Sequence, residues 1–218
     1  LNSLSHELKT PIAAIVGATD NLLAGSSRLS EENKKELVEG ISVATLRLNQ
    51  QVENLLSMSR LESGFIQPKK DWTDMNELVY DVVHRLEQQL KDHKLNISIE
   101  DNLPFYKLDY GLIEQVLYNL LYNAAVYTPE FSDILVQVKN NTDKTYTLDT
   151  GEKAPSSIKT ETNSLVIIVE DRGPGFPPEE ISKVFDKFYR LSNARTGGTG
   201  LGLSIVKGFV EAHNGTVI

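Results

Sequence analysis

The sequence contains no cysteine, so neither disulfide bonds nor thiolate chemistry can take part in its fold or function. No apolar run approaches the roughly 20 residues that a membrane-spanning helix needs, and no signal peptide is visible. Acidic residues outnumber basic residues. The net charge of -8 argues against a nucleic-acid binder, which usually presents a basic face. The 4 histidines are scattered without the spacing of metal ligands.

The composition is otherwise ordinary for a soluble globular protein. Hydrophobic residues make up 40% and charged residues 24% of the 218 residues, enough for one or two domains with sizeable cores. The chain opens on Leu1 inside a helical pattern, without an initiator methionine, and closes on residues 216–218, which indicate a strand just starting. We therefore expect a fragment cut at both ends, with its C-terminal strands missing and any membrane segment outside it.

Residues 1–66 predict two long amphipathic helices joined by a short turn. Apolar residues recur at heptad spacing up to about residue 24, and again between residues 31 and 63. Ser30 is the expected N-cap of the second helix, and Gly64 its end. A two-helix hairpin cannot bury both apolar stripes alone, so we expect a homodimer that forms a four-helix bundle.

His6 lies in the first of these helices, with Glu7 beside it. On the heptad it occupies an f position, opposite the apolar seam, so its ring should face solvent. Pro11 should kink the helix one turn beyond it. From this stretch alone, a surface histidine without a role is the simpler interpretation.

After a short linker at residues 67–71 the pattern changes to alternating helices and strands. Helices are predicted at 75–93, 112–125 and 201–212, strands at 95–99, 105–108 and 134–138, and a central strand at 165–169. This order predicts an α/β two-layer sandwich over residues 72–218, with one mixed sheet and helices on one face. We interpret the polar segment 140–163 as a mobile insertion rather than a small hairpin arm.

The first polar cluster of this second domain is a pair of asparagines. Asn119 and Asn123 are four residues apart on one predicted helix, although asparagine is a poor helix former. Carboxamide oxygens suit a hard cation such as Mg²⁺ and its waters. A solvated helix face explains the pair equally well.

The second cluster is the turn Asp171-Arg172-Gly173-Pro174-Gly175, directly after the apolar strand. An acid at a strand end can accept a hydrogen bond from an exocyclic amine such as that of adenine. The two glycines permit close approach of a flat ligand. Taken alone, an ordinary tight turn is the simpler interpretation.

The third cluster is a glycine-rich loop, residues 197–203, that runs into a helix. Such a loop exposes backbone donors to phosphate. It is not a dinucleotide-binding fingerprint, because the third glycine would fall at Leu203, and it lacks the Gly-Lys-Ser/Thr of a P-loop. A flexible surface loop is the alternative.

Together and in this order the motifs are specific. Nearly the whole chain resembles the catalytic core of a bacterial two-component sensor histidine kinase. Residues 1–66 are similar to the dimerisation and phosphoacceptor domain, and residues 72–218 to the ATP-binding domain shared with the gyrase, heat-shock-90 and MutL (GHKL) ATPases. The matching motifs are the H box at 5–11, the N box at 115–123, the G1 box at 171–175, the F box at 185–190 and the G2 box at 198–202. The stretch from Leu55 to Trp72 is most similar to the potassium-sensing KdpD type.

The resemblance implies an ATP-dependent protein-histidine kinase. His6 would be the phosphoacceptor, attacking the γ-phosphate through Nε2, and Glu7 would accept the proton from the other ring nitrogen. The phosphoryl group would pass to an aspartate of a response regulator. Thr10, one turn from His6, would orient a water in a phosphatase reaction. The parent protein would be a membrane-anchored bacterial sensor with this part in the cytoplasm.

The resemblance also implies ATP and Mg²⁺ as ligands. Asp171 would bind adenine, Asn119 would help to place the phosphates, and Asn123 would hold the metal. Either Arg190 or Arg195 could contact the γ-phosphate. The implied nucleotide-binding residues are Asn119, Asn123, Asp171, Gly173, Gly175, Arg190, Arg195, Gly198, Thr199, Gly200, Leu201 and Gly202.

Two other functions remain open at this point. Many relatives carry Lys or Arg at the position of Val126, so one phosphate contact could be absent here. The chain could then be a degenerate ATP-binding scaffold that dimerises without transferring phosphate. A stand-alone ATPase of the gyrase type is less well supported. Those relatives place a catalytic glutamate on the N-box helix, where this chain has Asn119 and Asn123.

Overall fold

The computed structural model describes residues 2–25, 29–64, 66–141, 146–148, 156–158, 164–191 and 198–218. The chain divides into two compact units. The first consists of residues 1–66 and 182–208, and the second of residues 67–181 and 209–218.

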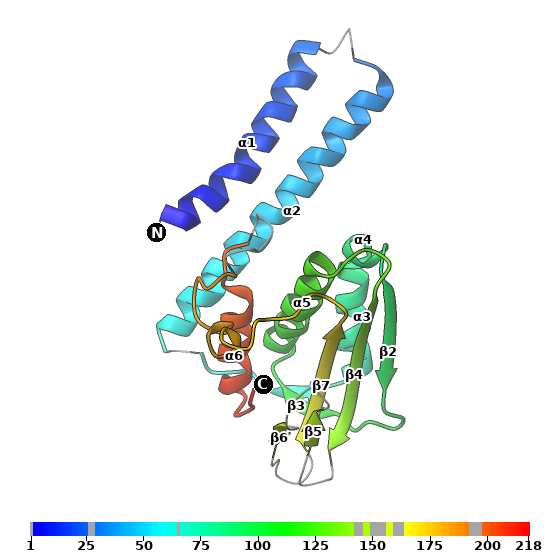
Figure 1. The fold of residues 1–218 in the computed structure, drawn as a ribbon, viewed down its shortest axis with the longest axis vertical. Helices are drawn as coiled ribbons and strands as arrows, with labels where there is room; N and C mark the ends of the chain where they lie inside the picture. Colours follow the sequence, from blue (N-terminus) through cyan, green and yellow to red (C-terminus); the bar gives the residue numbers. More distant parts are fainter. Residues whose placement is uncertain are drawn as a thin grey trace. The chain divides into compact units, whose positions relative to one another are not determined.

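The first unit begins with a helical hairpin of α1 (Asn2–Gly25) and α2 (Glu31–Glu62), which lie side by side (Figure 1). Ser30 caps α2 as predicted, because its hydroxyl accepts a hydrogen bond from the N–H of Asn33 at 3.1 Å. Gly64 follows the end of α2 with a φ of +68°, a conformation that favours glycine. The predicted hairpin is therefore confirmed.

The heptad stripe faces the partner helix of the hairpin. α1 continues through Pro11, which is buried, and Ala44 is buried on α2. The stripe positions are buried or half-buried, namely Leu8, Pro11, Ile15, Ala18 and Leu22 on α1 and Leu37, Ile41, Ala44, Leu48, Gln51, Leu55 and Met58 on α2. Periodicity alone thus identified the inner face.

The second unit contains most of the α/β domain. Its elements are β1 (Asp71–Thr73), α3 (Met75–Arg85), α4 (Glu87–Leu90), β2 (Lys94–Ile99), β3 (Tyr106–Leu108), α5 (Tyr110–Tyr127), β4 (Asp133–Asn141), β5 (Tyr146–Leu148), β6 (Ser156–Ile158) and β7 (Ser164–Asp171). The 3-10 helix η1 (Ile181–Lys183) and the helix α6 (Gly202–Ala212) follow in the chain.

The main described sheet has three strands in the order β2-β4-β7. β2 runs parallel to β4, whereas β7 runs antiparallel to it with Val136 opposite Val169, so the sheet is mixed as predicted. The prediction of β7 as the central strand was wrong, because β4 lies in the middle of these three. The inward residues of β4, such as Ile134 and Val138, are fully buried, whereas the apolar run of β7 is only half-buried.

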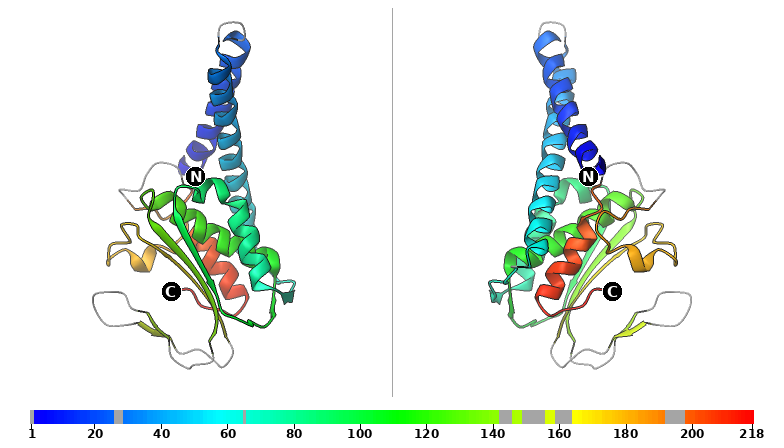
Figure 2. Two further views of the ribbon diagram at one scale, coloured as in Figure 1. Left: turned by 90° about the vertical axis from the view of Figure 1, so that its right-hand side faces the viewer. Right: turned by 90° about the vertical axis from the view of Figure 1, so that its left-hand side faces the viewer.

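Helices α3 and α5 cover one face of this sheet (Figure 2). Their apolar sides and β4 form one core, which includes Leu78, Val79, Val82, Leu86, Leu117, Leu121, Ile134, Val136 and Val138. The hydroxyl of Tyr110 donates to Oδ2 of Asp81 at 2.5 Å and so joins the two helices. Burial and this hydrogen bond raise the pKa of Tyr110, which keeps the hydroxyl protonated as a donor. The predicted two-layer sandwich is confirmed.

The helix predicted at residues 75–93 is interrupted at Leu86. This residue has φ -101° and ψ 12°, which separates α3 from the single turn α4. Both Leu86 and Leu90 are buried, so the apolar spacing continues across the break. For that reason periodicity could not reveal it.

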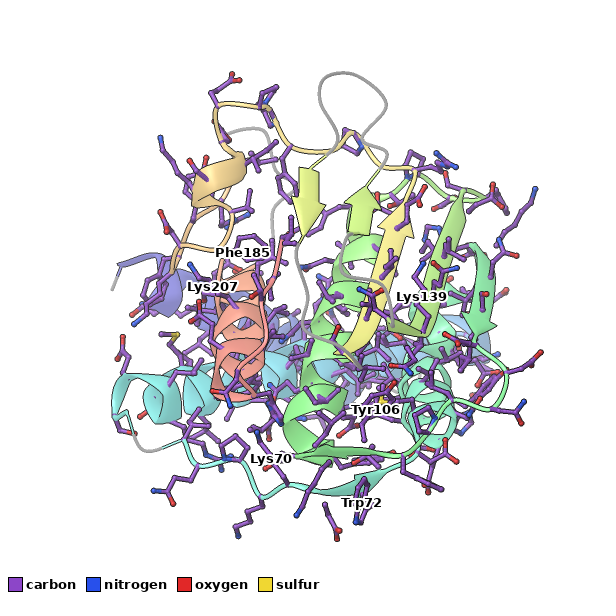
Figure 3. All side chains as sticks on the ribbon, turned by 90° about the horizontal axis from the view of Figure 1, so that it is seen from below. Lys70, Trp72, Tyr106, Lys139, Phe185 and Lys207 are labelled. Atoms are coloured by element: carbon purple, nitrogen blue, oxygen red, sulfur yellow. The ribbon has the colours of Figure 1, made fainter. Side chains whose placement is uncertain are left out.

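The described residues also form two small antiparallel sheets. β1 was not predicted; it pairs with β3, placing Trp72 opposite Lys107. The Trp72 side chain is 68% exposed and points away from the sheet, whereas Tyr106 on β3 is half-buried (Figure 3). Within the segment 140–163, β5 pairs with β6. This pairing is what the alternative of a small hairpin arm predicts, whereas the mobility expected of the insertion stays a prediction, and residues 142–145, 149–155 and 159–163 lie outside the described residues.

Replacing Leu78 by alanine should destabilise the α/β core. The side chain is fully buried on α3, and a truncation of this kind costs about 2–5 kcal/mol of unfolding free energy. Denaturant unfolding followed by circular dichroism would measure the loss. The exposed neighbour Glu77→Ala is the matched control and should change stability by less than about 0.5 kcal/mol. Equal effects of the two changes would contradict the placement of this core.

Candidate functional site

Asp109 fixes the start of α5, the helix that carries the asparagine pair. Its Oδ1 accepts from the N–H of Leu112 at 3.2 Å, and its Oδ2 accepts from the N–H of Lys69 at 2.7 Å. Its own N–H donates to Nε2 of His213 at 3.0 Å. Nδ1 of that ring lies 2.8 Å from the carbonyl oxygen of Phe209, so Nδ1 carries the proton. The chain at Lys69 and the ring of His213 are therefore both hydrogen-bonded to Asp109 at the start of α5.

The two asparagines of α5 differ in burial. Asn119 is 4% exposed, and its Nδ2 has no hydrogen-bond partner in the described part of the chain. Asn123, one turn later, is half-buried. A buried donor without a partner costs about 1–3 kcal/mol. The site therefore fits a ligand that brings an acceptor, such as a phosphate oxygen, and the Asn123 carbonyl oxygen suits Mg²⁺.

Asp171 stands at the end of β7 with its side chain exposed. Its Oδ1 accepts a hydrogen bond from the N–H of Gly173 at 2.7 Å. A Cβ on Gly173 would lie 2.7 Å from that oxygen and 3.2 Å from Oγ1 of Thr128. Gly175 has a φ of +67°. Glycine at both positions thus allows a tight turn that leaves the carboxylate accessible to an exocyclic amine.

Thr128 is a candidate that the sequence did not single out. It is 3% exposed, and its hydroxyl has no partner among the described residues, although it lies beside the turn at Gly173. Its N–H donates to the carbonyl of Ala124 and ends α5. The only signal in the sequence is its position directly before Pro129, which marks the end of a helix rather than a site.

The glycine-rich loop packs on the F box within the first unit. Gly200 has a φ of +67°, and a Cβ there would lie 2.7 Å from the backbone of Phe188 and Tyr189. The N–H of Phe188 donates to the carbonyl of Gly200 at 2.9 Å. Thr199 is 8% exposed and Leu201 is fully buried. The loop is thus held by its own backbone contacts and leads directly into α6.

One contact joins two predicted site residues from opposite ends of the sequence. Nη1 of Arg190 donates to Oε1 of Glu7 at 3.0 Å. The side chains are 27% and 12% exposed, respectively, so the ion pair is partly withdrawn from water. Sequence motifs assigned these two residues separate roles and did not predict that they meet.

The predicted site residues divide between the two units. The first unit contains His6, Glu7, Thr10, Arg190, Gly198, Thr199, Gly200, Leu201 and Gly202, and the second contains Asn119, Asn123, Asp171, Gly173 and Gly175. His6 lies in α1, but its side chain and all of Arg195 fall outside the described residues, so the exposure of the His6 ring stays a prediction. Thr10 is exposed.

In the described residues no group of three or more His, Cys, Asp or Glu could hold a metal ion alone. A cation at Asn123 would therefore need further oxygen ligands, such as nucleotide phosphates. Among the same residues, no helix combines the length and the apolar character that a membrane span requires.

Two family profiles match this chain. Residues 1–64 match the His Kinase A (phospho-acceptor) domain, and residues 108–218 match the histidine kinase-, DNA gyrase B- and HSP90-like ATPase. The chain belongs to the histidine kinase family. The resemblance drawn from the five motifs is confirmed, and the second profile implies ATP binding.

Curated relatives of the chain are sensor proteins. Sensor protein KdpD of Clostridium acetobutylicum is 33% identical over 221 residues, which cover 100% of this chain and 22% of that protein. Sensor histidine kinase WalK of Bacillus subtilis is 32% identical over 225 residues, covering 99% of this chain and 33% of that protein. The chain therefore spans about a fifth to a third of the length of these relatives.

Solved histidine kinases share the fold. Acinetobacter baumannii histidine kinase AdeS matches with a TM-score of 0.60 and 23% identity, over 95% of this chain and 86% of that chain. Histidine kinase ThkA, solved in complex with the response regulator protein TrrA, matches with a TM-score of 0.58 and 22% identity, over 97% and 53%. The hairpin followed by an α/β sandwich is thus a known arrangement of elements.

Gly173→Ala should weaken ATP binding by at least about tenfold. The new Cβ would meet Oδ1 of Asp171 at 2.7 Å and displace the carboxylate from its present position. Titration with a fluorescent ATP analogue would measure the dissociation constant. Gly111→Ala is the matched control, because a Cβ there meets its nearest atom only at 3.7 Å. Unchanged affinity in Gly173→Ala would argue against adenine binding at this turn.

Proposed function

We propose that this chain transfers the γ-phosphoryl group of ATP to His6 and then to an aspartate of a response regulator. One observation carries the proposal: the same chain contains a phosphoacceptor-type hairpin and an ATPase-type domain. The division into domains would follow the predicted boundaries, with residues 1–66 and 72–218 joined by a linker at 67–71.

The residues of the chain fit each part of this reaction. Nε2 of His6 would attack the γ-phosphorus, and the carboxylate of Glu7 would take the proton from Nδ1. The exposed Asp171 would accept from the adenine amine. The unpaired buried amide of Asn119 would donate to a phosphate oxygen, and Asn123 would bind Mg²⁺.

The partner of the phosphorylated histidine would be a receiver domain. ThkA, a protein of similar fold, has been solved with a response regulator protein bound. Thr10 is exposed, as a residue that orients a hydrolytic water for a response-regulator phosphatase reaction would have to be. The chain would act in the cytoplasm as part of a longer, membrane-anchored sensor.

A second copy of the chain would cover the outer face of the hairpin. Large apolar side chains beside the heptad stripe are exposed, including Ile12 at 46%, Val16 at 53%, Val38 at 55%, Val52 at 41% and Leu56 at 49%. Apolar residues along the outside of two paired helices indicate a further helical partner. A homodimeric four-helix bundle would bury them.

Incubation with labelled ATP and Mg²⁺ should place phosphate on His6. The label should survive alkali and be lost in acid, as expected for a phosphohistidine, and His6→Gln should abolish it while ATP binding remains. Filter assays with the dimeric protein would measure incorporation. His84→Gln, an exposed histidine on α3, is the matched control and should retain full incorporation.

The outcomes separate this function from the scaffold alternative. Label retained in His6→Gln would contradict the assignment of the phosphoacceptor. ATP bound without any label in the unchanged protein would favour a degenerate scaffold, for which Val126 is the supporting residue.

Val16→Lys combined with Val52→Lys should shift the protein from dimer to monomer. Each change puts a charge on an exposed apolar position of the hairpin, where a second copy would have to bury it. Light scattering coupled to gel filtration would give the mass. Tyr80→Lys, at an exposed position on α3, should leave the dimer intact. A doubly substituted protein that remains dimeric would place the interface elsewhere.

A further inference from the structure

The segment of the first unit that contains the F box contacts both helices of the hairpin. Arg190 forms its ion pair with Glu7 on α1, and Nζ of Lys187 lies 3.0 Å from Oε1 of Glu62 on α2. Both bonds join a basic F-box residue to an acidic hairpin residue. Two ion pairs therefore link the F box to the hairpin.

The two ion pairs differ in their exposure to solvent. The side chains of Lys187 and Glu62 are 48% and 57% exposed, and such pairs contribute little to stability. Those of Arg190 and Glu7 are 27% and 12% exposed, so solvent ions screen their attraction less. Glu7–Arg190 is accordingly the less screened and stronger of the two ion pairs.

The positions of α1 that are helical neighbours of Glu7 carry no lysine or arginine. Helical neighbours lie three and four residues away, and these positions hold Ser3, Leu4, Thr10 and Pro11. The only lysine nearby, Lys9, is two residues on and exposed on another face. A carboxylate withdrawn from water needs a partner, and Arg190 supplies the charge from 183 residues away.

Both members of the pair have a second use in the proposed reaction. Glu7 would accept the imidazole proton, and Arg190 is one of the two arginines that could contact the γ-phosphate. Phosphate oxygens carry more negative charge than one carboxylate and match the guanidinium fork, so a phosphate competes with Glu7 for this arginine. While Arg190 is bound to Glu7, it occupies one oxygen, Oε1, of the carboxylate that would accept the proton.

We propose that Arg190 is a positioning residue with two alternative partners: it holds the Glu7 carboxylate when nucleotide is absent, and the γ-phosphate of ATP draws it away. This inference rests on the proposed function. In the transfer step a bond forms between Nε2 of His6 and the γ-phosphorus, the bond from that phosphorus to the ADP oxygen breaks, and the Nδ1 proton moves to Glu7. Loss of Arg190 from the carboxylate makes that oxygen available as ATP arrives, which couples nucleotide occupancy to the proton acceptor.

Zero-length cross-linking with a carbodiimide tests the pair directly. The reagent joins a carboxylate to an adjacent primary amine but does not join it to a guanidinium. In Arg190→Lys, peptide mass spectrometry should detect a cross-link between position 190 and Glu7, which the unchanged protein cannot form. The link between Lys187 and Glu62 should form in both proteins and serves as the internal reference. If the reference forms but the link from position 190 to Glu7 does not, the pair is overturned.

Nucleotides test the competition in the same Arg190→Lys protein. A saturating non-hydrolysable ATP analogue with Mg²⁺ should lower the cross-link yield at Glu7 at least about threefold, whereas ADP should leave it unchanged. An unchanged yield with the bound analogue would overturn the competition, and an equal loss with ADP would overturn the γ-phosphate as the competitor. Binding of the analogue is measured separately by calorimetry. Failure to bind would count against the proposed function, while the cross-link without nucleotide still tests the pair.

Labelling of carboxylates with a small amine gives a second measurement in the unchanged protein. Modification of Glu7 should rise when the ATP analogue binds, because the carboxylate loses its partner. Arg190→Gln should show the high level with or without nucleotide, and the conservative Arg190→Lys should restore the nucleotide-dependent change. A purely structural ion pair would give labelling that does not respond to nucleotide.

Discussion

The hydrogen bonds of Asp109 are the constraint on which the α/β unit most depends. Both carboxylate oxygens and the backbone N–H are used, joining the first turn of α5 to the chain at Lys69 and to the ring of His213. A helix start leaves backbone donors without partners, and a side chain that caps it also fixes where the helix begins. The positions of Asn119 and Asn123 follow, because both lie on the same rigid helix.

Burying polar groups without hydrogen-bond partners on this helix costs folding free energy. A ligand that supplies the missing partners can offset that cost. The Asn119 amide and the Thr128 hydroxyl are both enclosed and unpaired within the described residues. Apolar residues at these positions would have avoided that cost. Polar groups held ready in this way bind a ligand without first breaking internal hydrogen bonds, which is the general advantage of a preorganised site. The same helix therefore supplies core packing on one side and unsatisfied donors on the other.

Local pattern explains what the sequence could and could not predict. The hairpin, its Ser30 cap and the α/β layers follow from periodicity and capping, which act within a few residues. The break at Leu86 has no such signal, because apolar spacing continues through it. The central position of β4 depends on pairing between distant strands, and a continuous apolar run on β7 was a misleading guide. The contact of Glu7 with Arg190 joins residues 183 apart, so only the folded chain reveals it.

The glycines of the two ligand-type motifs are required for different physical reasons. At Gly173 a Cβ would meet the Asp171 side chain, so glycine there serves the orientation of a functional group. At Gly200 a Cβ would meet the backbone of Phe188, and φ is positive, so both packing and backbone conformation demand glycine there. A glycine-rich loop before a helix is usually taken as a sign of phosphate binding. In this chain the packing on the F box requires Gly200 whether or not phosphate is bound. Arg190 directly follows the F-box residues that Gly200 packs against. The packing that requires glycine at position 200 therefore also restrains the backbone next to Arg190, the residue that contacts Glu7.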